Sequence, residues 1–156
     1  MDASGAILTR LRMQLSSLPA LLGGARRRDY DVRVGDKWSV TEHVAHLARY
    51  HEVTIERVRL ILTEHNPTLD AYRAEADPEW PAWRGVSFED AGLRMHAARA
   101  TLIGILESIT PEQWTRTGRH PRFGDLSLRA WMEFFLVHEG HHLYVITKRA
   151  RGPTVD

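Results

Sequence analysis

Three histidines have the residue type and the spacing of a divalent metal site. His138 and His142 lie four residues apart in a segment with helical periodicity, so their side chains share one helix face. They are about 6 Å apart along the axis, and two such imidazoles can bind one ion. His46 lies at the edge of an apolar stripe on an earlier segment and can supply a third nitrogen. Three protein ligands leave coordination positions open, as in catalytic metal sites.

The alternative for each histidine is a core residue whose nitrogens are satisfied by neighbours. Two inward imidazoles at chelating spacing are costly to bury without a ligand, which favours the metal site. The sequence has no cysteine, so any ion must be held by His, Asp or Glu. Of the other histidines, His43 and His51 share the helix of His46. His141 is expected either at the surface or in contact with a ligand from outside the site, and His96 at a rim or at the surface. His65 and His120 are expected in loops, without a role.

The run from His138 to His142 also satisfies H-E-x-x-H, the zinc peptidase pattern in which Glu is the general base. The extended peptidase motif requires Gly and His at the positions of Val145 and Lys148, and no strand is predicted to hold a peptide. A metal-dependent hydrolase of this type is therefore a remote alternative. Glu139 is either a base or ligand-orienting residue, or a polar residue on the helix surface.

Four amphipathic segments must position these residues. The first spans 4–22, with Pro19 expected to kink or shorten its last turn before Gly23 and Gly24 end it. The second starts at Ser39 and Glu42, which have the spacing of a capping box, and stops at Asn66 and Pro67. Its apolar stripe is predicted at Val40, Val44, Leu47, Ile55, Val58 and Leu62.

The third helix is predicted to open at Ser87 and Asp90 and to end at Thr110 and Pro111. The fourth spans 127–151 and is terminated by Gly152 and Pro153. Its inward stripe is predicted at Leu128, Trp131, Phe135, His138, His142 and Val145, and that of the third helix at Leu93, Ala97, Ala100, Ile103 and Leu106.

Residues 67–85 form a long connection between the second and third helices. Trp80 and Trp83 in it are expected either at a pocket rim, where the connection would act as a lid, or exposed at a dimer contact. No alternating strand pattern is present. The sequence thus predicts an all-α fold, a four-helix bundle with a long connection between helices 2 and 3, forming one domain over residues 1–156. Such bundles place cofactors between facing helices.

Charge and hydropathy exclude several classes of function. The 21 Lys and Arg residues against 20 Asp and Glu give a formal charge of +1, so binding to nucleic acid or to a membrane surface is not expected. The first residues lack the pattern of a signal peptide, and no stretch is long enough to span a bilayer. We therefore expect a cytoplasmic protein.

Residues 38–42, followed by His46 and Leu47, and residues 124–128 leading into 138–142 resemble the DinB/YfiT-like superfamily of metalloenzymes. The resemblance covers nearly the whole chain and implies His46, His138 and His142 as the metal ligands. It also implies a four-helix bundle, commonly a homodimer, with zinc, nickel, iron or manganese as the ion. Some members are transferases or isomerases that use a low-molecular-weight thiol such as mycothiol or bacillithiol, and others are known only as damage-inducible proteins.

The leading hypothesis is a metal-dependent enzyme in which a thiol or water at the open position attacks a small electrophilic substrate. Arg49, Arg57 and Arg129 are candidates for recognising carboxylates of such a thiol, the alternative being solvation at the surface. Two other hypotheses remain open. One is a non-catalytic protein of the stress response that sequesters a small molecule or metal, and the other is a purely structural dimerisation module.

Overall fold

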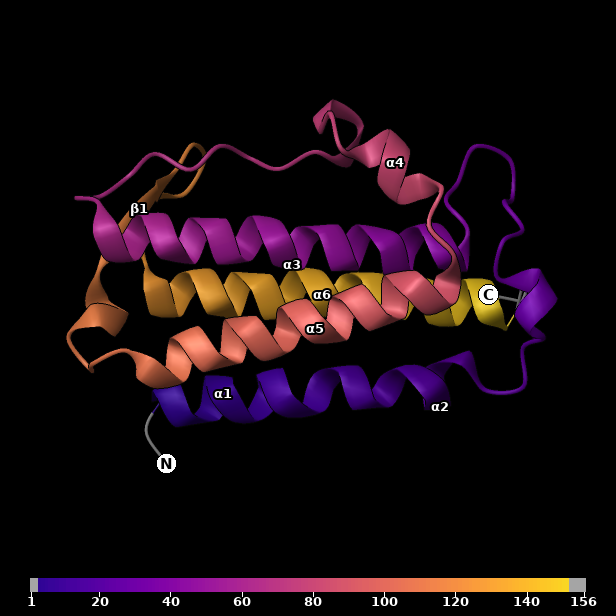
Figure 1. Cartoon of the computed structure of the whole chain (residues 1–156), viewed down its shortest axis with the longest axis horizontal. Coiled ribbons are helices and arrows are strands. Elements are labelled where there is room, and N and C mark those ends of the chain that lie inside the picture. Colours follow the sequence, from indigo (N-terminus) through magenta and orange to yellow (C-terminus); the bar gives the residue numbers. More distant parts are fainter. Residues whose placement is uncertain (1–2, 152–156) are drawn as a thin grey trace.

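Four long helices lie side by side along the long axis of the molecule (Figure 1). The computed structural model describes residues 3–151, and the predicted helix end at Gly152 and Pro153 lies outside them. Within this range every helix is too short or too polar to pass through a lipid bilayer. The bundle consists of α1 (Ala3–Met13) continued by η1 (Gln14–Ser17) and α2 (Leu18–Leu22), α3 (Val40–Thr63), α5 (Phe88–Ser108) and α6 (Leu128–Ala150). The predicted four-helix bundle is confirmed.

The connection between α3 and α5 determines the topology. It first runs back over the length of α3 as an extended segment, residues 67–79, which we call the strap (Figure 1). The strap contains the 3₁₀ turn η3 (Ala74–Ala76) and leads into the short helix α4 (Trp80–Arg84). Because the chain returns in this way, α3 and α5 run in the same direction, and α1 and α6 run opposite to them. One side of α3 is thus covered by the strap.

Serine side chains cap the three later helices where the sequence predicts. Ser39 Oγ accepts from Glu42 N at 3.1 Å and Glu42 Oε2 accepts from Ser39 N at 2.8 Å, which completes the capping box of α3. Ser87 and Ser127 cap α5 and α6. Near Pro19 the first helix breaks into a 3₁₀ turn and a short α-helix, because proline cannot donate a backbone hydrogen bond.

The buried face of α5 differs from the predicted one. Leu93 is 70 % exposed, and Ala97 and Ala100 also face solvent. The helix is rotated so that a charged residue, Arg99, lies in the core. An arginine is buried only where its charge is compensated, and Arg99 forms an ion pair with a carboxylate of α6. The buried residues of α5 are Ala91, Met95, Arg99, Leu102 and Leu106.

A β-hairpin precedes α6, where the sequence analysis predicts only a loop. Strands β1 (Thr117–His120) and β2 (Gly124–Ser127) pair antiparallel after the turn η4 (Gln113–Thr115). The prediction of no strands is wrong here, because four-residue strands give no alternating pattern. β1 also holds the start of the strap: Leu69 N donates to Arg119 O at 2.9 Å, and Arg119 N donates to Pro67 O at 2.8 Å. At Gly118 a Cβ would lie 2.9 Å from side-chain atoms of Ile61 and Leu69, so glycine permits this close packing.

Candidate metal centre

The structure brings His46 of α3 together with His138 and His142 of α6. One nitrogen atom from each ring lies within 4.8 Å of the other two. The Nε2 atoms of His46 and His138 are 3.2 Å apart. Two nitrogens bound at 2.0–2.1 Å to one tetrahedral ion are separated by about 3.3 Å, so this spacing suits a shared ion. The three residues selected by helical periodicity therefore converge between two helices.

The hydrogen bonds of the chain leave two of these rings half satisfied. His46 and His142 are buried, and His138 is half-buried, so the cluster reaches solvent on the His138 side. Nδ1 of His46 and Nδ1 of His138 are buried, and neither has a hydrogen-bond partner among residues 3–151. Such atoms are rare in folded proteins and call for an explanation. With the ring protons on these Nδ1 atoms, the facing Nε2 atoms of both rings have lone pairs for an ion, so the residues present fit a divalent metal.

His43, one turn before His46, is a member of the cluster that the sequence analysis did not select. Its Nδ1 lies 2.9 Å from Nδ1 of His142. When His142 donates its Nδ1 proton to His43, the Nε2 lone pair of His142 stays free for an ion. His43 thus orients the ring of a candidate ligand. The spacing of His43 and His46, three residues apart on α3, was the signal that could have found it.

Aromatic rings enclose the cluster. The ring centroid of Tyr50 is 4.0 Å from that of His138, and the centroids of Trp38, Tyr72 and Trp80 are 5.0, 5.7 and 6.0 Å from that of His46. This wall keeps water from the imidazoles on the buried side and lowers the local dielectric constant.

The tryptophans of the connection pack inside the chain. Trp80 is only 4 % exposed and Trp83 only 5 % exposed, so the expectation that they are exposed at a dimer contact is wrong. The expectation of a rim residue fits Trp80 better, because its ring lies edge-on to His46 and against Trp38. Trp83 instead packs into the core under α4, where Arg94 lies over its ring.

Burial keeps the imidazoles of the cluster neutral. Burial, together with the neighbouring imidazoles or cations, lowers the pKa of His43 to about 4, of His46 to about 3, of His138 to about 4 and of His142 to about 2. Neutral imidazole is the form that binds a metal ion. The cluster is therefore in its ligating form at neutral pH without any further proton loss.

Acid should destabilise the metal-free protein. Between pH 6.5 and the lowered pKa values of these histidines, the unfolded chain binds protons that the folded chain excludes. The free energy of unfolding is thus largest above pH 6.5 and falls as the pH drops, by up to about 1.4 kcal/mol per pH unit for each histidine. Urea unfolding in EDTA at pH 7.5, 6.5 and 5.5 measures this. The exposed His65→Gln variant should keep the same slope, and a stability independent of pH would contradict the prediction.

Glu139 is not a surface residue and does not join the histidine cluster. It is fully buried, where it forms an ion pair with Arg99 and accepts a hydrogen bond from Gln14 Nε2 at 2.9 Å. Arg99 also donates to Leu11 O at 2.8 Å and to His51 Nε2 at 2.9 Å. Residues from all four bundle segments thus meet in one buried polar network. Both oxygens of the H-E-x-x-H carboxylate already accept hydrogen bonds, so the structure gives it no role as a free base.

The remaining histidines lie mostly where they were expected. His141, His96 and His65 are exposed. His120 differs from the prediction of a loop residue without a role. It is buried at the end of β1, and its Nδ1 accepts hydrogen bonds from the backbone N of Arg122 and Phe123, which stabilise the hairpin turn.

The three candidate arginines have different environments. Arg49 binds Asp77 at 2.8 Å and Glu52 at 3.0 Å, so its charge is neutralised. Arg129 donates to Ser4 Oγ near the start of α6, more than two helical turns before His138. Arg57 is the one of these three that lines a cavity without forming an ion pair with any residue in the described range 3–151.

A bundle with parallel α3 and α5, joined by a strap and carrying a histidine cluster between α3 and α6, defines a class of helical protein with a candidate metal centre. The sequence profile of the DinB superfamily matches residues 10–146. The chain belongs to the DinB superfamily, as the resemblance of its motifs implied.

A solved structure and two relatives support the assignment. YfiT from Bacillus subtilis has the same fold, with a TM-score of 0.80 at 21 % identity over 95 % of this chain and 86 % of that one, and is described as a probable metal-dependent hydrolase with an unusual four-helix bundle topology. A protein of Bacillus mycoides (strain KBAB4) is 26 % identical over 147 residues, 90 % of this chain and 84 % of the relative. One of Bacillus cereus (strain 03BB102) is 29 % identical over 122 residues, 78 % and 69 % of the two chains. Both are named "Putative metal-dependent hydrolase".

Proposed function

We propose that this protein is a metal-dependent enzyme that activates an exogenous nucleophile for attack on a small electrophilic molecule. The observation that carries the proposal is the 3.2 Å approach of His46 Nε2 and His138 Nε2 in a cluster where one nitrogen of each ring, that of His142 included, lies within 4.8 Å of the other two. A divalent ion held by these three residues would supply a Lewis acid that lowers the pKa of the nucleophile.

The residues of the chain perform the other tasks. The aromatic wall would exclude water from the buried side, and a substrate would approach from the side on which the half-buried His138 reaches solvent. By accepting the Nδ1 proton of His142, His43 would hold that ring in the tautomer whose Nε2 binds an ion. Among residues 3–151 no carboxylate forms a hydrogen bond or ion pair with the three imidazoles. Glu139, the carboxylate of the H-E-x-x-H run, is bound to Arg99 instead. The general base of H-E-x-x-H peptidases therefore has no counterpart in this site.

Water and a low-molecular-weight thiol are the two candidate nucleophiles. The names of the relatives as hydrolases support water. The family resemblance supports a thiol, and the absence of cysteine from the sequence means that such a thiol would come from a cofactor. Both nucleophiles would use the same centre. Because the names of the relatives support water, we propose hydrolysis as the principal reaction and thiol transfer as the second candidate.

A panel of activated esters tests the proposal. The metal-free protein is loaded with zinc, nickel, iron(II) or manganese(II) and assayed on nitrophenyl esters, with and without added thiol. We expect turnover that requires the ion and is lost in His46→Ala, whereas the exposed His96→Ala keeps it. Mass spectrometry then separates the acid formed by water from the thioester formed by the thiol. No turnover with any ion would overturn the proposal, and a ligand that raises the melting temperature without product would favour a sequestering protein.

A further inference from the structure

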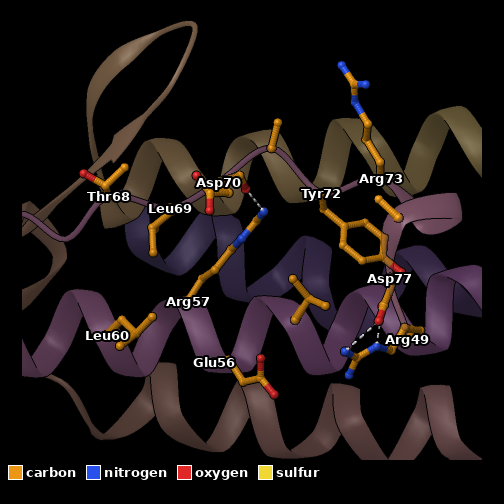
Figure 2. Close-up of a pocket in the computed structure, with 13 residues that line it drawn as sticks. Arg49, Glu56, Arg57, Leu60, Thr68, Leu69, Asp70, Tyr72, Arg73 and Asp77 are labelled. Carbon is orange, nitrogen blue, oxygen red and sulfur yellow. Dashed lines mark hydrogen bonds and ion pairs between the residues drawn. The ribbon is translucent and has the colours of Figure 1, made fainter. Parts of the chain in front are cut away.

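A cavity of about 410 Å³ lies between α3 and the strap (Figure 2). Its volume is in the range of small-molecule sites. Arg57 and Leu60 of α3 and Leu69 and Tyr72 of the strap are among the residues that line it. None of the three candidate metal ligands lines this cavity. However, Tyr72 stacks on His46 with 5.7 Å between the ring centroids, so a single aromatic ring separates the cavity from the candidate metal centre.

Arg57 presents its guanidinium in this cavity, below the strap (Figure 2). The group lies 5.8 Å from the ring centroid of Tyr50 and 5.4 Å from that of Trp131. It donates to the carbonyl oxygen of Asp70 at 2.5 Å and to Tyr50 Oη at 3.4 Å. All of these partners are neutral, and within residues 3–151 no carboxylate forms an ion pair with Arg57. The positive charge is thus held in place but not compensated.

The other charged residues of the cavity do not replace Arg57. Arg49 is neutralised by Asp77, and the side chain of Arg73 extends away from the cavity (Figure 2). Glu56 and Asp70 are exposed, so water solvates their carboxylates. Arg57 is therefore the cation that this cavity offers to a ligand.

We propose that this cavity binds the oxyanion, a carboxylate or phosphate, of the small molecule whose reactive end reaches the histidine cluster. A guanidinium fork matches an oxyanion through two parallel hydrogen bonds. Tyr50 lies under Arg57, and its ring centroid is 4.0 Å from that of His138, so Arg57 and the cluster contact the same aromatic side chain. That the other end of this molecule reacts at the histidine cluster rests on the proposed function. The molecule that carries the anionic group is either the electrophile or the thiol.

Binding to the metal-free protein tests the cavity without any activity. Melting curves are recorded with glutarate, inorganic phosphate and, as a control, chloride at equal ionic strength. We expect glutarate or phosphate to raise the melting temperature of the parent chain and of Arg59→Met, an exposed arginine of α3 outside this cavity. In Arg57→Met, which keeps an apolar stem over Trp131, the Kd should weaken about tenfold or more. Equal shifts with chloride, or an unchanged Kd in Arg57→Met, would overturn the inference.

Turnover distinguishes this inference from the proposed function. With the loaded protein, Arg57→Met should raise the KM of the mono-nitrophenyl ester of succinate and leave that of nitrophenyl butyrate unchanged. If the thiol carries the anion, the KM of glutathione rises instead and that of its diethyl ester does not. Equal KM values in the variant and the parent chain would overturn the inference alone. If no ester reacts while Arg57-dependent binding persists, the proposed function fails and the anion site stands.

Discussion

We expect the parent chain to purify with a divalent ion and His142→Ala to purify without one. The substitution removes one of three nitrogens that converge within 4.8 Å, and two remaining imidazoles cannot hold the ion in competition with water. Loss of a partner outside the ligand shell typically weakens metal binding by about 10- to 100-fold, so loss of a direct ligand should cost more. Elemental analysis of protein purified without nickel resin measures the stoichiometry, with one ion per chain expected for the parent.

Two neighbouring variants make the result specific. His141→Ala removes an exposed imidazole next to the cluster and should keep the full stoichiometry. His43→Ala removes the residue that orients His142 and should weaken binding by about 10- to 100-fold without abolishing it. A stoichiometric ion in His142→Ala, or no ion in the parent chain after incubation with any of the candidate metals, would refute the metal centre.

Arg99→Met should destabilise the protein by about 3–5 kcal/mol, the usual cost of removing one partner from a buried ion pair. The substitution leaves the carboxylate of Glu139 in the core without its cation. Burial already raises the pKa of Glu139, so the group is costly to keep charged there. The same change also leaves His51 Nε2 and Leu11 O without their donor. The free energy of unfolding in urea at pH 7.5 measures the effect.

An exposed ion pair between the same kinds of residue provides the control. Arg10 and Glu133 pair across α1 and α6 with about 45 % of each side chain exposed, so Arg10→Met should cost no more than about 1 kcal/mol. The double variant Arg99→Met with Glu139→Leu removes both buried charges and should recover part of the loss. If Arg99→Met is as mild as Arg10→Met, the buried network does not stabilise the bundle in the way that we infer.

The helices could be predicted from the sequence because their signals are local. Periodicity and serine caps depend on residues that are three or four apart, and the starts of α3, α5 and α6 follow from them. The rotation of α5 could not be predicted in this way. Arg99 is buried only because Glu139, 40 residues later, lies opposite to it, and an apolar pattern assigns a charged residue to the surface. The hairpin was missed because the strap supports its short strands from a distant part of the chain.

The candidate site could be predicted from the sequence only where its signals are local. His138 and His142 share a helix face by spacing alone, and His46 was selected by its position beside an apolar stripe. The choice among the candidate arginines required tertiary structure. Arg49 is neutralised by Asp77 of the strap, whereas Arg57 meets only neutral groups, and no local pattern distinguishes the two.

The strap and α4 supply part of the surroundings of the candidate metal centre from outside the four long helices. The candidate ligands lie on α3 and α6, but Tyr72 and Trp80, which face them, belong to the strap and the helix that follows it. The exposed side chains of the strap, such as Arg73 and Glu75, can change without disturbing the bundle, whereas the buried Leu69 and Ala74 pack into the core. Sequence changes in the exposed part of the strap would thus alter the outer surface beside the candidate centre and leave in place the helices that carry its ligands.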